Sequence, residues 1–106
     1  MTAVRSDALA ILQRHVGRLN GVTAAVLALD LDINERQVRH FVSELRLEGI
    51  AICGHPKTGY FIAANGEELE MCCAFLRSRA MHSLVLESRM RKLTLGELLG
   101  QLRLHT

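Results

Sequence analysis

Cysteine and histidine residues are the first candidates for chemistry in this sequence. Cys53 and His55 are two positions apart, and Cys72 is followed directly by Cys73. Zinc sites draw on thiolates and imidazoles at spacings such as C-x-x-C, and the sequence contains no such pair. Neighbouring residues on a helix point about 100° apart, so Cys72 and Cys73 are poorly placed to share one metal ion. We therefore expect no metal and no cofactor, and interpret the thiols as ordinary buried or half-buried side chains.

Carboxylates and hydroxyls form a second group that could do chemistry. Glu67, Glu68 and Glu70 are clustered, but acidic residues also stabilise the positive end of a helix that begins just before them. Ser43 and Ser83 lack the strand–turn–helix setting of a nucleophilic serine, and no glycine-rich phosphate loop follows a strand. We therefore expect that the chain is not an enzyme, although a role as one subunit of an enzyme stays open.

Basic side chains offer a third chemistry, the binding of phosphates and base edges in nucleic acid. The segment 35–48 carries three arginines against three glutamates, and the segment 77–92 carries five basic residues against Glu87 alone. Local basic faces can meet phosphates even though the whole chain has a net charge of only +2. For 77–92, a solvent-exposed helix face explains the charges equally well.

Length and composition limit what can position these groups. The chain has 106 residues, 49% of them hydrophobic and 23% charged, which predicts one folded domain with at most a small appendage. With three Phe, one Tyr and no Trp, the core is expected to be aliphatic. No stretch is long and apolar enough to span a membrane, and residues 1–15 lack a signal-peptide pattern. Three cysteines, an odd number, argue against a disulfide scaffold and favour the reducing cytoplasm.

Hydrophobic periodicity predicts helices joined to one β-hairpin. The expected helices are 7–19, 24–30, 35–48, 67–93 and 95–104. Their expected starting residues are Ser6 with Asp7, Thr23, Asn34, Glu67 with Glu68 after the break at Asn65-Gly66, and Thr94. Apolar residues alternate on both sides of the Gly- and Pro-containing loop 54–59, which predicts the hairpin. The expected core positions of the first three helices are Leu9, Leu12, Val16, Leu19, Val26, Leu27, Leu31, Val38, Val42 and Leu45.

Three segments resemble a winged helix-turn-helix domain. They are Leu27-Ala28-x-x-Leu31-x-Ile33-Asn34, then Arg36-x-Val38-Arg39-x-x-Val42-x-x-Leu45-Arg46-x-x-Gly49-Ile50-x-Ile52, then Gly59-Tyr60-Phe61-Ile62. Residues 7–64 are most similar to the N-terminal DNA-binding domain of the biotin repressor/ligase and to small phage-encoded DNA-binding proteins. Asp32 stands where that family usually has glycine in the turn, and Asp tolerates the left-handed conformation. Because these 106 residues contain no ligase segment, the resemblance does not imply biotin chemistry.

The resemblance implies an α+β, mostly α fold. It would be a three-helix winged helix-turn-helix with a two- or three-stranded wing, followed here by a long C-terminal helix and a short terminal helix. In that family the segment matched by 35–48 is the recognition helix, and the wing corresponds to 54–59. Arginine can pair with guanine O6 and N7, and glutamine with adenine N6 and N7.

Carried over by position, these roles give two sets of candidate DNA contacts. The candidates for base contacts in the major groove are Arg36, Gln37, Arg39, His40 and Ser43. The candidates for contacts with the DNA backbone, which position the protein without reading sequence, are Thr23, Arg46, His55, Lys57 and Thr58. Plain solvent exposure is the alternative explanation for each of these polar side chains.

The region after residue 64 is expected to be a separate helical tail, so the predicted domains are 1–64 and 65–106. Its apolar arc is wide for a single surface helix. The tail therefore either folds back on the first domain or pairs with a second copy of the chain, and we favour pairing into a homodimer. A dimer would place two recognition helices on a palindromic site. The candidate dimer contacts are Leu69, Leu76, Leu84, Leu95, Leu98 and Leu102.

The sequence thus predicts a cytoplasmic DNA-binding protein of bacterial or phage origin, most consistent with a transcriptional regulator. Its partners would be double-stranded DNA and a second copy of the chain, with no membrane partner. Helix 35–48 would enter the major groove while the wing 54–59 contacts the backbone. Two alternatives stay open: a phage DNA-packaging or replication accessory protein with an oligomerising tail, and a winged-helix module that binds only protein.

Overall fold

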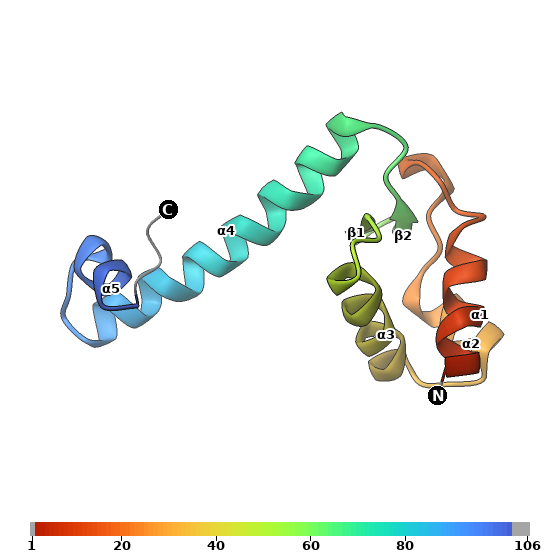
Figure 1. The fold of residues 1–106 in the computed structure, drawn as a ribbon, viewed down its shortest axis with the longest axis horizontal. Coiled ribbons are helices and arrows are strands. Elements are labelled where there is room, and N and C mark those ends of the chain that lie inside the picture. The colour runs from red at the N-terminus through yellow and green to blue at the C-terminus, as the bar shows by residue number, and fades with distance from the viewer. Residues whose placement is uncertain (1, 103–106) are drawn as a thin grey trace. The chain divides into compact units, whose positions relative to one another are not determined.

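The computed structural model describes residues 2–102, which fall into two compact units divided between Cys72 and Cys73. Within this range the protein is α+β and mostly helical, with five α-helices and one two-stranded antiparallel sheet, which confirms the predicted class. The first unit contains α1 (Thr2–Leu12), a 3-10 turn η1 (Arg18–Asn20), α2 (Ala24–Leu31), α3 (Glu35–Leu47), β1 (Ile52–His55), β2 (Gly59–Ile62) and the start of α4 (Gly66–Met90). The second unit contains the rest of α4 and α5 (Leu95–Leu102) (Figure 1).

The core of the first unit is aliphatic, as its composition predicts. Helices α1, α2 and α3 pack against one another, and β1 packs against α3 (Figure 1). Predicted core residues from all three helices are buried, whereas Leu9 and Leu31 are half-buried and Val26 is exposed. The buried residues that form one continuous cluster are Leu12, Val22, Leu27, Ala28, Val38, Val42, Leu45 and Ile52.

Helix α1 begins and ends earlier than predicted. Its observed bounds are Thr2–Leu12 rather than 7–19, so Ser6 and Asp7 lie inside the helix and do not start it. The predicted core role of Leu19 is also wrong, because its side chain is 93% exposed in the 3-10 turn η1. Helical periodicity beyond residue 12 is therefore misleading in this segment.

Pairing with β2 explains why the chain leaves the helix. The backbone N–H of Gly17 donates to the carbonyl of Ile62 at 2.9 Å, and the N–H of Ile62 donates to the carbonyl of His15 at 2.8 Å. These bonds form a parallel bridge between Val16 and Ile62. Val16, predicted to be in the core, is consequently 43% exposed. Gly17 takes a φ of 93°, which a side chain would disfavour, at this exit.

The predicted hairpin is present, and a third segment pairs with it. β1 and β2 are antiparallel, with Cys53 opposite Phe61. Tyr60 also bridges to Val22, through backbone hydrogen bonds of 2.8 Å and 2.7 Å between the two residues. Gly59 is required at this crossing, because its φ is 84° and a Cβ would lie 2.3 Å from the Val22 carbonyl oxygen. The loop and the segment before α2 are thereby held together.

Local capping defines both ends of α2 and the start of α3. Thr23 Oγ1 accepts a hydrogen bond from the N–H of Val26 at 3.2 Å, as expected for the start of α2. Asp32 adopts the expected left-handed conformation at the end of that helix, with φ 54° and ψ 49°. Asn34 and Gln37 then form a reciprocal capping box that begins α3. The predicted starts of both helices are therefore confirmed.

The second unit is a helical hairpin. Helix α4 was expected at 67–93 and is observed at Gly66–Met90, and Thr94 and Glu97 form the capping box that begins α5. Leu98 of α5 is buried. The predicted end of this helix, residues 103–104, lies outside the described residues.

Over residues 2–102, no helix combines the length and apolarity needed to cross a lipid bilayer.

Candidate nucleic-acid interface

Helix α3 presents a continuous polar face to solvent. Val38, Val42 and Leu45 recur at helical spacing and are buried on the side facing the core. The opposite side is therefore free of packing contacts with the core. All five predicted base-reading residues lie there and are exposed: Arg36, Gln37, Arg39, His40 and Ser43.

Most of the functional groups on this face have partners within α3. Arg39 Nη2 lies 3.7 Å from Glu35 Oε1, and His40 Nε2 lies 3.0 Å from Glu44 Oε1. Gln37 Oε1 accepts the N–H of Asn34 at 3.0 Å, so two-point recognition of adenine would require the capping box to open.

Arg36 is the exception among the charged side chains of this face. Its guanidinium forms no ion pair with any residue between 2 and 102. The side chain is exposed near the beginning of α3. Of the predicted base-reading residues, Arg36 is therefore the one whose charge is most available to a ligand.

Arg5 of α1 changes the electrostatics at the other end of α3, and sequence reasoning missed it. Its guanidinium pairs with Glu44 at 3.5 Å and also with Glu48, the residue after the end of α3. These carboxylates would otherwise repel phosphates approaching the helix. No local pattern marks Arg5, because its partners lie about forty positions later in the chain.

A surface hollow of about 860 Å³ runs along this part of α3 and α1. Its lining combines polar groups with apolar ones, and the apolar side chain of Leu47 is 88% exposed. The lining residues are Arg5, Asn34, Arg36, Gln37, His40, Phe41, Glu44, Leu47 and Glu48.

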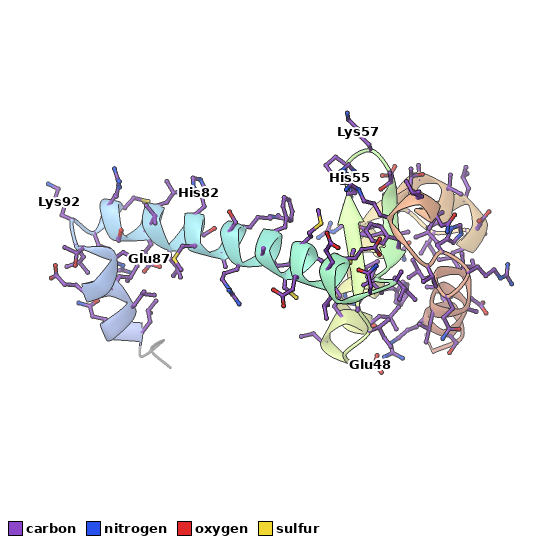
Figure 2. All side chains as sticks on the ribbon, turned by 90° about the horizontal axis from the view of Figure 1, so that it is seen from above. Glu48, His55, Lys57, His82, Glu87 and Lys92 are labelled. Carbon is purple, nitrogen blue, oxygen red and sulfur yellow. The ribbon has the colours of Figure 1, made fainter. Side chains whose placement is uncertain are left out.

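The hairpin loop carries three of the predicted backbone contacts, and they are not equivalent. His55 Nδ1 accepts hydrogen bonds from the N–H groups of Lys57 at 3.1 Å and Thr58 at 3.4 Å, which organises the turn. Lys57 is exposed, and its side chain points away from the rest of the first unit (Figure 2). The Thr58 hydroxyl is buried, so it is not available for the expected phosphate contact.

The two remaining backbone candidates also differ. Thr23 is exposed, and because its Oγ1 only accepts a hydrogen bond from Val26, its own O–H can still donate to a phosphate. Arg46 instead donates from Nε to the carbonyl of Ile52 at 2.8 Å and is half-buried. Its main contact therefore joins α3 to β1.

Glu68 has a structural role that the sequence did not reveal. Its carboxylate accepts the backbone N–H of Ala64 at 2.9 Å and that of Arg18 at 3.1 Å. These hydrogen bonds to the charged form hold the pKa of Glu68 below its ordinary value of 4.5. The carboxylate thus joins the first turn of α4 to the segment around η1.

Across residues 2–102, no group of three or more His, Cys, Asp or Glu side chains is arranged to hold a metal ion.

The predicted dimer contacts fall into three groups. Leu98 is only 1% exposed, so its own chain already covers it and it has no surface to offer a partner. Leu84 and Leu95 are half-buried. The leucines that remain exposed are Leu69, Leu76 and Leu102.

Comparison with known proteins finds no match to a protein-family model, a curated protein or a solved structure.

Proposed function

We propose that this protein binds double-stranded DNA as a transcriptional regulator, through a winged helix-turn-helix arrangement of the first unit. Helix α3 would enter the major groove, and the loop between β1 and β2 would act as the wing on the backbone. One observation carries this proposal: α3 buries an apolar stripe and turns a basic, hydrogen-bonding face to solvent, with the charge of Arg36 unpaired within residues 2–102.

Base reading is assigned first to Arg36, whose guanidinium can donate two hydrogen bonds to guanine O6 and N7. Arg39 and His40 can join it at small cost. Exposed ion pairs are typically worth about 0–1 kcal/mol, so DNA can displace the contacts to Glu35 and Glu44. Ser43 lies on the same exposed face and is compatible with either a base or a sugar contact.

Backbone contacts are assigned to Lys57 on the wing and to Thr23 at the start of α2. The N-terminus of α2 adds backbone N–H groups and a positive dipole near Thr23. Affinity should then fall steeply with salt, because each neutralised phosphate releases condensed counterions.

A DNA titration with charge-matched variants tests the proposal. The Arg36→Ala/Arg39→Ala protein is compared with Arg14→Ala/Arg77→Ala, which removes two exposed arginines that are not part of α3. At low salt we expect the α3 variant to bind a selected duplex about 100-fold more weakly than wild type, and the control to lose about 10-fold or less. Circular dichroism confirms that both variants are folded. Equal losses in the two variants, or no binding by wild type, would overturn the proposal.

A second copy of the chain is the other proposed partner. The exposed Leu76 and Leu102 of the second unit support this, since exposed apolar side chains of a small helical hairpin are covered at low cost by another copy. Light scattering measures the molar mass directly. A dimer fits the regulator, whereas the mass of a larger ring would favour a phage DNA-packaging or replication accessory role.

One observation favours a protein-binding module instead. The 88% exposed Leu47 lies in the hollow beside α3, where an apolar side chain gains nothing from phosphates. A Leu47→Gln variant tests the role of this apolar side chain. The DNA-binding proposal predicts that the variant binds DNA with nearly the affinity of the wild type.

A further inference from the structure

Two cysteines that are far apart in the sequence have neighbouring thiols in the first unit. The Cys53 thiol on β1 lies 3.8 Å from the carbonyl oxygen of Glu68, one helical turn before Cys72. The Cys72 thiol on α4 lies 3.8 Å from the carbonyl oxygen of Ile52, the residue before Cys53. Each thiol therefore lies against the backbone beside the other cysteine.

The two thiols differ in environment. Cys53 is buried, and desolvation raises its pKa to about 12, with the neighbouring Cys72 thiol adding to the effect. Cys72 is half-buried and so can be reached by a small reagent. The accessible thiol is expected to react first, and the buried one second.

We propose that Cys53 and Cys72 form a reversible intramolecular disulfide that ties β1 to the start of α4 when the protein meets a small disulfide oxidant. The disulfide would form whether or not the protein binds DNA. The bond would close a loop of the chain that contains the whole wing, β2 and the first turn of α4.

The disulfide forms in two successive thiol–disulfide exchanges. The Cys72 thiolate attacks one sulfur of the oxidant; the oxidant's S–S bond breaks, and one thiol leaves with a proton. Cys53 then attacks the Cys72 sulfur of the mixed disulfide, and the second thiol leaves with the proton from Cys53. The two protein thiols supply two electrons, which reduce the oxidant's disulfide to two thiols. Proximity offsets the weak acidity of Cys53 in the second step, because the exchange is intramolecular.

Cys73 provides a matched control within the same helix. It is exposed and follows Cys72 directly, but it points to a different side of α4. The Cys73→Ser protein keeps the proposed pair. The Cys72→Ser protein keeps Cys53 and Cys73 but lacks the proposed pair.

The experiment treats both folded variants with oxidised glutathione and measures intact mass, followed by tryptic peptide mapping. For Cys73→Ser we expect the loss of two hydrogens, no glutathione adduct, and a disulfide that joins peptide 47–57 to peptide 58–77. For Cys72→Ser we expect a glutathione adduct on Cys73 and no joined peptides. Dithiothreitol should reverse both changes.

The melting temperature provides a second readout of whether the bond fits the folded structure. Oxidised Cys73→Ser should melt higher than its reduced form, by on the order of 10 °C, because the bond closes a loop in the unfolded chain. A stable glutathione adduct on Cys72 without closure, or joined peptides in Cys72→Ser, would overturn the proposal. So would a joined product that melts no higher than the reduced protein.

Discussion

The two units of the chain differ most in how much apolar surface they bury. The first unit has a continuous cluster of eight buried residues drawn from three helices, the segment before α2 and β1. In the second unit, Leu98 is the one buried apolar side chain among residues 73–102. Helical hairpins of this size rarely hold together on so little core, whereas the first unit has a core of its own. The chain therefore combines a unit that has its own buried core with a helical unit that buries little apolar surface.

Truncating a core side chain should have the largest effect on stability, and the effect should differ between the two units. We expect Leu45→Ala to lower the free energy of unfolding of the first unit by about 3 kcal/mol, because it empties a fully buried site. Leu98→Ala should instead leave the first unit unchanged and reduce helix content in the second. Tyr60 lies in the first unit and is the one Tyr in a chain without Trp, so its fluorescence follows that unit. Circular dichroism follows helices in both.

If Leu45→Ala and Leu98→Ala unfolded with the same midpoint, the division of the chain into two separately unfolding units would be contradicted. In that case Leu98→Ala would shift the Tyr60 transition as much as Leu45→Ala does, and the two units would unfold as one.

Substituting glycine by alanine should change the stability of the two units in opposite directions. Gly59→Ala is expected to destabilise the first unit by about 2 kcal/mol, because the residue has positive φ and its Cβ would meet the Val22 carbonyl. Gly100→Ala is expected to stabilise α5 by about 1 kcal/mol, because the helix gains propensity and nothing lies within 4 Å. Urea titrations monitored by fluorescence and by circular dichroism measure both. A destabilised α5 in Gly100→Ala would show that this helix is packed more tightly than Leu98 alone indicates.

The smallest expected effect is a pH dependence confined to the first unit. Folding lowers the pKa of Glu68 below 4.5, so the folded protein binds its proton less readily than the unfolded chain. The stabilisation is therefore fully present above pH 4.5 and is lost as the pH falls through the lower pKa of the folded state. Glu68→Gln should weaken this dependence, whereas Glu67→Gln, which leaves both backbone hydrogen bonds in place, should retain it. Tyr60-detected unfolding at neutral and acidic pH measures the difference, and identical profiles for the two variants would contradict the assignment.

Much of the local structure could be predicted because its causes lie within a few residues. Thr23, Asn34 and Thr94 cap helices through side-chain bonds to groups three positions away. The stripe on α3 could be predicted for the same reason, since helical spacing alone sets which side chains share a face. The coarse class and the exposed face of α3 followed from these patterns, whereas the winged arrangement and the DNA contacts stay predictions.

Prediction failed where a distant contact overrode a local pattern. The helical spacing of Val16 and Leu19 continued past residue 12, but backbone pairing with β2 drew the chain out of the helix. Leu98 carried the same apolar signal as the exposed leucines, yet its own chain covers it.

The starts of α2, α3 and α5, the aliphatic core, the hairpin and the exposed polar face of α3 could all be predicted, because each depends on residue types at short spacing. The folded structure was needed to show that Arg5 pairs with Glu44 and Glu48, that the Thr58 hydroxyl is buried, and that the thiols of Cys53 and Cys72 are neighbours. These features depend on contacts between residues many positions apart, and short-range spacing carries no record of which distant segments meet.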